Sequence, residues 1–207
     1  IKQVKEPRRK PQYLTENDIV SLFSLGSVTD QMKRFVGFYL ATGLRRSTPF
    51  FGHMEGNWLV IPADAPYNKS KRELEVCLDS TLHKIWLEMM DVKRDWLDQG
   101  KQFDNLTGKI TKEFKRAVRE CGINDKHHLH NTRHTFAIRN WLKSNNIYEV
   151  KEQLGHSSVT VTEGYAKHKR SKISADFRSL TKQIGEVPKT LELVENVQDL
   201  MYNEDER

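Results

Sequence analysis

Apolar residues recur along the chain at spacings that predict a mainly helical protein. In the segment 29–42, five apolar residues fall on one face of a helix: Met32, Phe35, Val36, Tyr39 and Leu40. Gly43 follows them and is typical of a helix end. Thr15 and Asp18 have the spacing of a capping box, which predicts a helix from there to Leu25. Further helices are expected over 80–98, 110–121, 131–143, 147–154 and 171–183.

Two short segments have the character of strands instead. Residues 57–62 (NWLVIP) and 73–78 (ELEVCL) are predicted strands that flank a polar, lysine-rich connection. Each predicted helix is short enough to need packing against other elements for its stability. We therefore expect a compact, mainly α-helical domain with a small antiparallel β-sheet.

Charge is unevenly distributed along the 207 residues, whose formal net charge is +6. Residues 186–207 contain two basic residues, Lys189 and Arg207, and seven acidic ones. The first 185 residues therefore hold 32 basic and 21 acidic residues, a net charge of +11. This excess suits a polyanionic partner, whose binding would weaken with salt. A merely soluble basic surface would have the same composition.

Cysteine content and hydropathy indicate a reducing, intracellular compartment. Cys77 and Cys121 are the only cysteines and form no Cys-x-x-Cys pair, so neither a disulfide framework nor a zinc ribbon is expected. No apolar run approaches the ~20 residues that cross a bilayer. We expect a cytoplasmic protein with no membrane partner.

Five short motifs contain the groups that phosphodiester chemistry without a metal requires. Arginine donates paired hydrogen bonds to phosphate oxygens, a phenol can act as the nucleophile, and imidazole and ammonium groups move protons. In chain order the motifs are ATGLRR around Arg45, the polar connection with Lys69, HNTRH with His130 and Arg133, LGHSS with His156, and EGYAKH with Tyr165.

These motifs resemble the signature of the tyrosine recombinases, the phage-integrase family. The family's C-terminal signature is His-x-x-Arg, then Leu-Gly-His, then a tyrosine nine residues after that histidine. This chain matches it with His130, Arg133, His156 and Tyr165. Residues 42–47 (TGLRRS) match the family's upstream Thr-Gly-Leu-Arg-x-Ser. The resemblance covers residues 15–168 and implies the catalytic-domain fold of these DNA breaking-rejoining enzymes.

The resemblance also implies a site-specific DNA recombinase that needs no cofactor and no metal. Tyr165 would attack a DNA phosphate to form a 3′-phosphotyrosyl link. Arg45 and Arg133, with His156, would stabilise the transition state. Lys69 would protonate the leaving 5′-oxygen, and His130 would assist proton transfer near the tyrosine. Aligning residues 76–78 with a family strand selects Lys69, and Lys71 is its competitor.

Several neighbouring positions depart from the signature or lie outside it. The family often has an acidic residue after Arg-x-Ser, where this chain has Thr48, and commonly has Asp where it has Asn131. His134 is interpreted as structural, and Tyr67 has no motif around it. The histidines of HHLHNTRH do not form a zinc pattern, because no His-Glu-x-x-His is present and both cysteines are distant.

Domain organisation and partners follow from the same resemblance. Residues 1–13, with the basic lead KEPRRKP, are interpreted as a linker from a missing N-terminal DNA-binding domain, and residues 14–185 as the catalytic domain. The acidic tail 186–207 has apolar residues on one face of a helix over 189–203 and is expected to pack on a neighbouring protomer. Double-stranded DNA is the expected partner, with a tetramer expected on synapsed DNA and a monomer or weak oligomer when the protein is free. A bacterial, archaeal or phage origin is expected.

Two alternative functions remain at this point. A type IB topoisomerase-like enzyme would nick and reseal DNA with similar residues but would not exchange strands. A non-catalytic DNA-binding module would use basic helices and would not require Tyr165.

Overall fold

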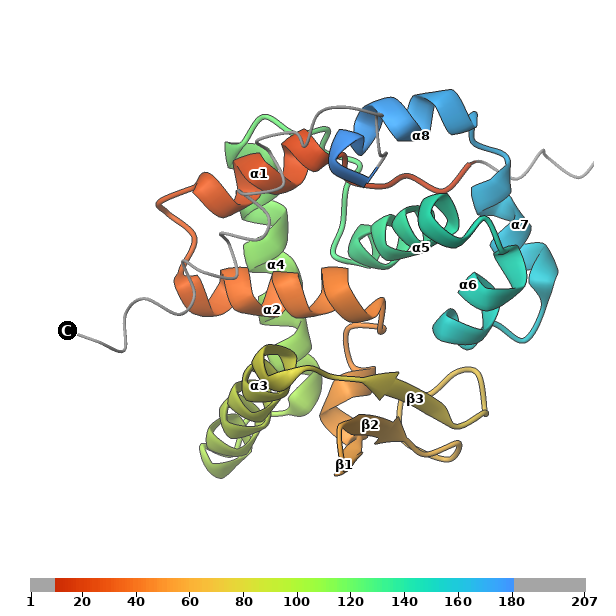
Figure 1. Cartoon of the computed structure of the whole chain (residues 1–207). Helices are drawn as coiled ribbons and strands as arrows, with labels where there is room; N and C mark the ends of the chain where they lie inside the picture. Colours follow the sequence, from red (N-terminus) through yellow and green to blue (C-terminus); the bar gives the residue numbers. More distant parts are fainter. Residues whose placement is uncertain (1–9, 181–207) are drawn as a thin grey trace, which may run out of the picture.

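The computed structural model of the protein, which describes residues 10–180, is mainly helical, with one small sheet at an edge of the molecule (Figure 1). The elements are α1 (Glu16–Ser24), α2 (Asp30–Thr42), the 3₁₀ helix η1 (Thr48–Phe51), β1 (His53–Glu55), β2 (Trp58–Ile61), β3 (Leu74–Cys77), α3 (Ser80–Asp98), α4 (Phe103–Glu120), α5 (His130–Ser144), α6 (Ile147–Leu154), α7 (Val159–Ala166), α8 (Arg170–Asp176) and the 3₁₀ helix η2 (Arg178–Leu180). The mainly helical fold predicted from the sequence is confirmed.

Two hydrophobic cores divide the described residues. The larger one joins α1–α4 to the sheet, and the smaller one holds apolar residues of α5–α8 together with Tyr13. In Figure 1 the helices α5–α8 lie together on one side of α2, and α2 packs directly against α5. The motifs found in the sequence lie on both sides of this α2–α5 junction.

The sheet has three antiparallel strands in the order β1-β2-β3. The pairing of β2 with β3 sets Leu59 opposite Val76 and Ile61 opposite Leu74, which confirms the two predicted strands. β1 was not predicted, because three residues are too few for an alternating pattern to be recognised. The polar connection of residues 62–73 therefore joins two neighbouring strands and projects from one end of the sheet.

Most helices lie where the sequence predicted them, and their ends have the expected chemistry. The side chain of Thr15 accepts a hydrogen bond from the backbone N–H of Asp18, and the Asp18 carboxylate accepts one in return, so the capping box is confirmed. Two ends differ. α4 begins at Phe103, seven residues before the predicted start, because Leu106 and Ile110 are both buried in the core and override the poor helix propensity of Gly108.

The C-terminal helices also differ from the prediction. α7 was not predicted, since its first four residues are β-branched and have low helix propensity; the Ser158 side chain caps it. The helix predicted over 171–183 ends at Asp176. Phe177 then turns inward against Tyr13, with ring centroids 5.8 Å apart, and the chain continues as η2. Residues 181–183 and the tail 186–207 lie outside the described residues.

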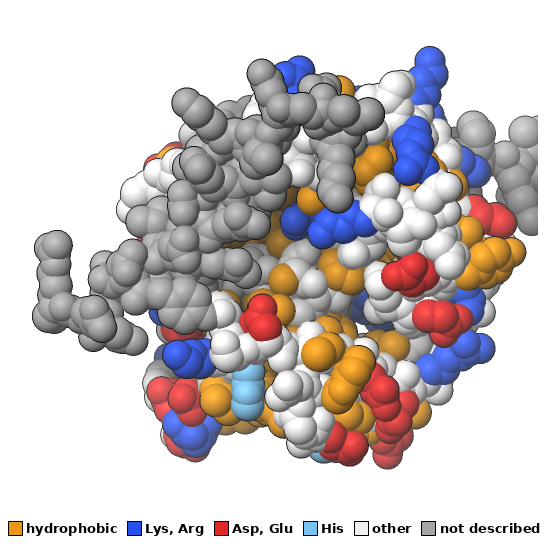
Figure 2. All heavy atoms as spheres, in the orientation of Figure 1, with side chains coloured by type: hydrophobic (Ala, Val, Ile, Leu, Met, Phe, Trp, Pro, Cys, Tyr) orange, Lys and Arg blue, Asp and Glu red, His pale blue; other side chains and the backbone are white. Residues whose placement is uncertain are grey.

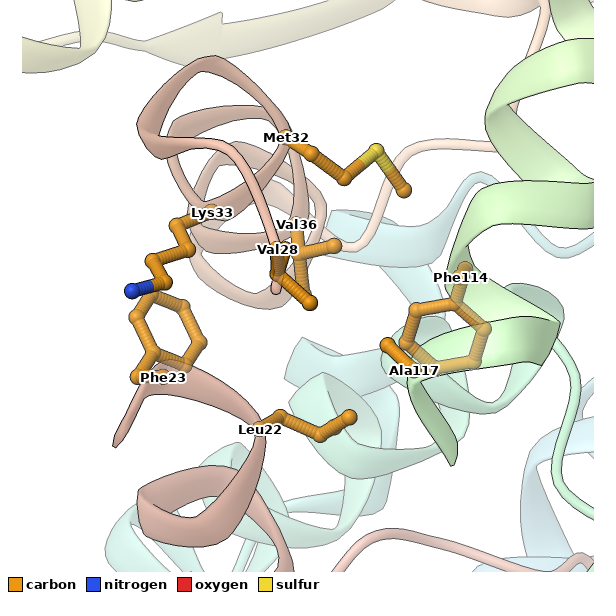
Figure 3. Close-up of a pocket in the computed structure, with 8 residues that line it drawn as sticks. All are labelled: Leu22, Phe23, Val28, Met32, Lys33, Val36, Phe114 and Ala117. Atoms are coloured by element: carbon orange, nitrogen blue, oxygen red, sulfur yellow. The ribbon is translucent and has the colours of Figure 1, made fainter. Parts of the chain in front are cut away.

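Three helices leave a small apolar groove between them. Leu22 and Phe23 of α1, Met32 of α2, and Phe114 and Ala117 of α4 point toward one another in Figure 3. No helix within residues 10–180 is both long and apolar enough to cross a membrane.

Candidate active site

Arg133 lies at the centre of the candidate site and is almost fully buried, with 2% of its surface exposed. Its Nη1 donates to the carbonyl oxygen of Gly43 at 2.7 Å, and its Nη2 donates to that of Leu154 at 2.5 Å. Both carbonyls lie at helix ends, two residues before Arg45 and His156. One guanidinium on α5 therefore holds in place the turns that carry two other predicted site residues.

Glycine is required at both of these turns. Gly43 has φ +64° and Gly155 has φ +60°, the left-handed conformation that ends α2 and α6. A Cβ on Gly155 would lie 2.1 Å from Cδ2 of Leu74, and one on Gly43 would lie 2.4 Å from Cδ1 of Phe136. The glycines of Thr-Gly-Leu-Arg and Leu-Gly-His thus allow the chain to turn sharply into the site.

Tyr165 lies on α7 with 2% of its surface exposed. Its phenolic oxygen is 2.8 Å from Nδ1 of His134. Burial raises the pKa of Tyr165 to about 12, while the charges of Arg133 and Arg45 lower it. The phenol is therefore protonated at neutral pH, and an attack by its oxygen requires that the proton be removed.

Three histidines surround the phenol and the guanidinium groups. The rings of His130 and His134 meet edge to face, with centroids 4.8 Å apart. Burial, followed by the nearby positive charges, lowers the pKa of His134 to about 3 and that of His156 to about 4. The pKa of His130 is lowered to about 4 by the same causes. His130 lies at the first turn of α5 and is itself exposed to solvent. The imidazoles of His134 and His156 are neutral at pH 7.

His156 is held by a neighbour on α7. Its Nδ1 lies 3.0 Å from Oγ1 of Thr162, and both residues are buried. The loop histidine is therefore fixed to the helix that carries Tyr165. Thr162 has no motif in the sequence, and only the fold identifies it.

Beside these groups lies a cavity of about 670 Å³, whose lining includes Arg45, Lys69 and His130. Burial lowers the pKa of Arg45, and its Nη1 is buried with no hydrogen-bond partner among the described residues. An unpaired cationic donor in a cavity is suited to an anionic oxygen. Lys71 does not line this cavity and has φ +53° in the turn, which favours Lys69 over its competitor.

The structure brings all six predicted site residues into one cluster. Arg45, Lys69 and His130 line the cavity, and the charges of Arg45 and Arg133 act on both Tyr165 and His156. Sequence reasoning missed His134, which was interpreted as structural but contacts the phenol directly. Its position one helical turn after His130 could have indicated that the two rings share a face.

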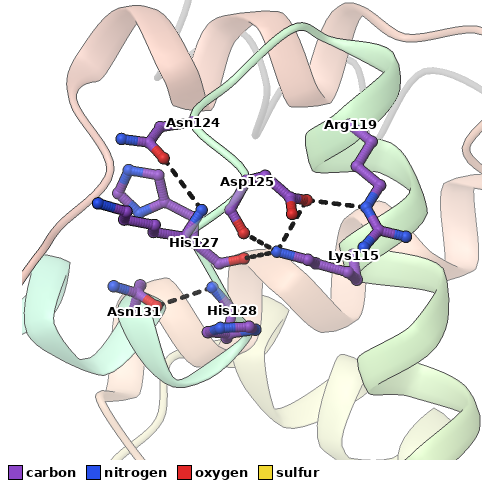
Figure 4. Close-up of polar contacts among 8 residues, drawn as sticks. Lys115, Arg119, Asn124, Asp125, His127, His128 and Asn131 are labelled. Atoms are coloured by element: carbon purple, nitrogen blue, oxygen red, sulfur yellow. Dashed lines mark hydrogen bonds and ion pairs between the residues drawn. The ribbon is translucent and has the colours of Figure 1, made fainter.

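A polar network holds the loop that leads into α5 (Figure 4). Lys115 donates to the carbonyl oxygens of Asp125 and His127, and Arg119 donates to the Asp125 carboxylate at 2.8 Å. Asn131 accepts from the backbone N–H of His128 at 2.8 Å. Its Nδ2 donates to the carbonyl oxygen of Gln12, also at 2.8 Å. The loop and the segment before α1 are thus tied to the helix that carries His130 and Arg133.

The surface of the described residues shows no uniform charge on the face drawn in Figure 2. Basic and acidic side chains are interspersed there, with apolar side chains between them. Within residues 10–180, no group of three or more His, Cys, Asp or Glu side chains is placed to hold a metal ion.

Comparisons with known proteins agree with this geometry. The sequence model of the Phage integrase family matches residues 12–172. A comparison with curated protein sequences gives no match.

Solved structures provide the fold comparison. XerH site-specific recombinase, bound to a palindromic difH substrate in a post-cleavage complex, has a TM-score of 0.60 and 16% identity over 81% of this chain and 52% of its own. XerA recombinase has a TM-score of 0.61 and 20% identity, covering 87% of this chain and 68% of its own. A lambda integrase dimer bound to a COC′ core site has a TM-score of 0.56 and 15% identity, covering 79% and 50%.

The chain thus spans about half the length of the XerH and lambda integrase chains. At these identities the structural likeness shows a shared fold, that of the tyrosine recombinase catalytic domain. The family match extends over most of the sequence and includes every motif quoted above. The chain belongs to the phage integrase family.

Proposed function

We propose that the chain is the catalytic part of a site-specific DNA recombinase that cuts and rejoins DNA through a 3′-phosphotyrosyl intermediate. The observation that carries this proposal is the environment of Tyr165. Its buried phenol lies beside His134 and within reach of the charges of Arg45 and Arg133, next to a cavity lined by cationic groups. A nucleophile, phosphate-binding donors and proton carriers are all supplied by one chain.

In the first step the Tyr165 oxygen attacks the phosphorus of a DNA phosphodiester, and the bond from phosphorus to the 5′-oxygen breaks. Arg45 and Arg133 bind the non-bridging oxygens, on which negative charge accumulates in the transition state. Two of the five N–H groups of Arg133 are used on backbone carbonyls, which leaves three for this purpose. When the Thr162 hydroxyl donates to Nδ1 of His156, the ring proton lies on Nε2 and can be donated to the same phosphate.

The phenol proton passes to the imidazole pair. Because the phenol of Tyr165 is hydrogen-bonded to His134, we assign His134 as the first acceptor of the phenol proton. His130, whose ring contacts that of His134, assists. Both imidazoles are weak bases in the DNA-free protein, since burial and the arginines lower their pKa values. A bound phosphate anion offsets the arginine charges and raises these pKa values, so base strength increases when DNA binds.

Lys69 supplies the proton for the departing 5′-oxygen. It lies at the cavity with Arg45 and His130, in the connection between β2 and β3. Return of the same 5′-hydroxyl reseals the strand, and attack by a 5′-hydroxyl from another duplex exchanges strands. The phosphotyrosine conserves the bond energy in both cases, so the scheme uses no cofactor.

Double-stranded DNA is the proposed partner, recognised by a tetramer at synapsis. The likeness to XerH on difH and to a lambda integrase dimer on a COC′ core site supports DNA as the partner. The net charge of +11 on the first 185 residues supports it as well. A topoisomerase-like enzyme with the same chemistry differs in not joining two duplexes.

The test is covalent capture of the full chain on DNA. Nicked duplexes with a randomised core are incubated with the protein in EDTA, and SDS-resistant adducts are sequenced to identify the cleaved site. Tyr165→Phe should abolish the adduct, while Tyr148→Phe, on the exposed side of α6, should not. An adduct that survives Tyr165→Phe would overturn the proposal. Mixing two labelled duplexes of the recovered site then separates strand exchange from simple resealing.

The division of the chain into domains is part of the same proposal. Residues 14–185 act as the catalytic domain, 1–13 lead in from a DNA-binding domain, and the acidic tail 186–207 packs on a neighbouring protomer. The tail's charge is opposite to that of the rest of the chain, which supports such docking. Deleting 187–207 should leave cleavage by single protomers intact or increased, while strand exchange falls. A truncated protein that recombines like the full chain would contradict this role.

A further inference from the structure

The connection of residues 62–73, which carries Lys69, is closed by a single buried side chain. Asn68 is 2% exposed, although the residues on both sides of it are exposed. Its Nδ2 donates to the carbonyl oxygens of Pro62 and Arg72, each at 2.8 Å. Its Oδ1 accepts from the backbone N–H of Ser70 at 3.3 Å and from the Ser70 hydroxyl at 2.5 Å. The amide thus joins the start of the connection to its end.

The backbone around Asn68 has a conformation that L-residues seldom adopt. Tyr67 has φ +66° and Lys71 has φ +53°, and neither is glycine. Such left-handed residues are disfavoured and persist only where their surroundings hold them. The Asn68 side chain, between these two positions, makes four hydrogen bonds that hold this turn, alongside backbone bonds from Asn68 to Ala65 and from Lys71 to Asn68.

A second contact fastens the connection to the body of the domain. The Tyr67 hydroxyl donates to Oδ1 of Asp104 in the first turn of α4 at 2.7 Å. The Tyr67 ring packs against Phe51 and Phe103, with centroids 5.4 and 5.5 Å away. The backbone before Lys69 is therefore fixed by the contacts of Tyr67 and Asn68, and the backbone after it by the hydrogen bonds of the Asn68 side chain to Ser70 and Arg72.

We propose that Asn68, with support from Tyr67, is a positioning residue that holds the ammonium of Lys69 at the cavity beside Arg45 and His130. A lysine has four rotatable side-chain bonds and is exposed here, so a mobile connection would spread its ammonium over many positions. Fixing the backbone on both sides confines that spread before DNA binds. This inference rests on the proposed role of Lys69 as the proton donor.

The test uses the full chain and the duplex recovered by covalent capture, made with either oxygen or sulfur at the 5′-bridging position. A thiolate leaves without a proton. The sulfur substrate therefore restores the cleavage rate only of variants that have lost the proton donor. Lys69→Ala should lower the cleavage rate of the oxygen substrate by about 10²-fold or more and recover on sulfur. Asn68→Asp keeps the shape and the Ser70 contacts but directs an acceptor at two carbonyl oxygens. We expect it to lose about tenfold on oxygen and to recover on sulfur in the same way.

Two further variants complete the design. Tyr67→Phe removes the bond to Asp104 but keeps the ring contacts, so a smaller loss with the same recovery is expected. Asn124→Ala removes a side chain that accepts only from the N–H of Lys126 and should show no difference between the two substrates. Hydrogen exchange at residues 67–72 should be faster in Asn68→Asp than in the original chain, which checks the clamp without any DNA.

The outcomes separate the two proposals. If Lys69→Ala recovers on sulfur but Asn68→Asp is equally slow on both substrates, Asn68 does not position the acid and this inference is overturned. An Asn68→Asp variant with unchanged cleavage overturns it as well. If Lys69→Ala itself fails to recover, the assignment of Lys69 is wrong, and the role of Asn68 falls with it.

Discussion

The Nη2 of Arg133 donates to the carbonyl oxygen of Leu154 at 2.5 Å, so a side chain proposed to bind phosphate also holds the end of α6. Its Nη1 does the same for Gly43 at the end of α2. Arg133 is therefore part of the architecture of the site as well as of its chemistry. Arg45 differs, because its Nη1 has no partner among the described residues.

This difference predicts that the two arginines contribute unequally to stability. Arg133→Ala leaves two buried carbonyl oxygens unpaired, and we expect the free energy of unfolding to fall by ~2–4 kcal/mol. Arg45→Ala should change it by less than ~1 kcal/mol, while both variants lose adduct formation. Urea unfolding measures the free energy of unfolding of each variant, and covalent capture measures adduct formation. Equal destabilisation by the two substitutions would contradict the structural role of Arg133.

The sequence predicted the parts of this site that depend on local chemistry. The glycine after α2 was recognised because only glycine readily ends a helix in the left-handed conformation. The contacts of His134 and Asn68 could not be predicted in this way. Each depends on a residue brought near by tertiary packing, the phenol of Tyr165 or the carbonyls at the two ends of a turn.

Helix α7 illustrates the same limit at the level of the fold. Its β-branched residues argue against a helix, yet Thr162 and Tyr165 are buried against the rest of the domain. Tertiary packing overrides the local preference there. The helix that carries the nucleophile was consequently the one that the pattern of apolar residues missed, although the motif had identified Tyr165 itself.

His134 should affect the attacking group more directly than a structural histidine would. His134→Ala removes the hydrogen-bond partner of the Tyr165 phenol, and we expect adduct formation to slow by about 10²-fold at neutral pH. Because hydroxide must then remove the proton, the rate of the variant should rise with pH where the original chain has levelled off. Rates measured from pH 6 to 9 on the captured site test this expectation.

His53→Ala is the matched control for that measurement. His53 lies on β1, where its ring contacts the exposed Glu55. This substitution should leave both the rate and its pH dependence unchanged. If His134→Ala lowers the rate equally at every pH, the imidazole orients the phenol without accepting its proton.

Asn131 occupies a position where the family commonly has Asp, and the structure gives a reason for the amide. Its Oδ1 accepts from the N–H of His128, and its Nδ2 donates to the carbonyl oxygen of Gln12. The carboxylate of Asp could accept from the N–H of His128 in the same way. It could not donate to the carbonyl oxygen of Gln12, and its own oxygen would lie against that carbonyl oxygen. We expect Asn131→Asp to lower the free energy of unfolding by ~1–3 kcal/mol at pH 7.

Asn146→Asp provides the comparison. Asn146 caps α6 and only accepts, from the N–H groups of Tyr148 and Glu149, so Asp should be tolerated there. Urea unfolding of the two variants at pH 7 gives the difference directly. Similar stabilities would show that the bond to Gln12 contributes nothing measurable.

The buried histidines predict how stability depends on pH. The pKa values of His134 and His156 are lowered from 6.5 to about 3 and about 4 in the folded chain. Between these values and pH 6.5 the unfolded chain binds protons that the folded chain does not. Stability from this source is therefore complete above pH 6.5 and is lost as the pH falls toward 4. His130 is exposed, so water can solvate its charged form and it contributes less to this dependence.

Each proton taken up on unfolding changes the free energy of unfolding by ~1.4 kcal/mol per pH unit. At pH 5 we expect a slope from these two histidines of up to ~2.7 kcal/mol per unit, measured by urea unfolding between pH 5 and 7.5. His134→Gln and His156→Gln should each reduce this slope by ~1.4 kcal/mol per pH unit, the contribution of one proton, whatever they do to stability at pH 7.5. Slopes identical to that of the original chain would mean that both imidazoles have the same pKa in the folded and the unfolded chain, and that burial does not keep them neutral below pH 6.5.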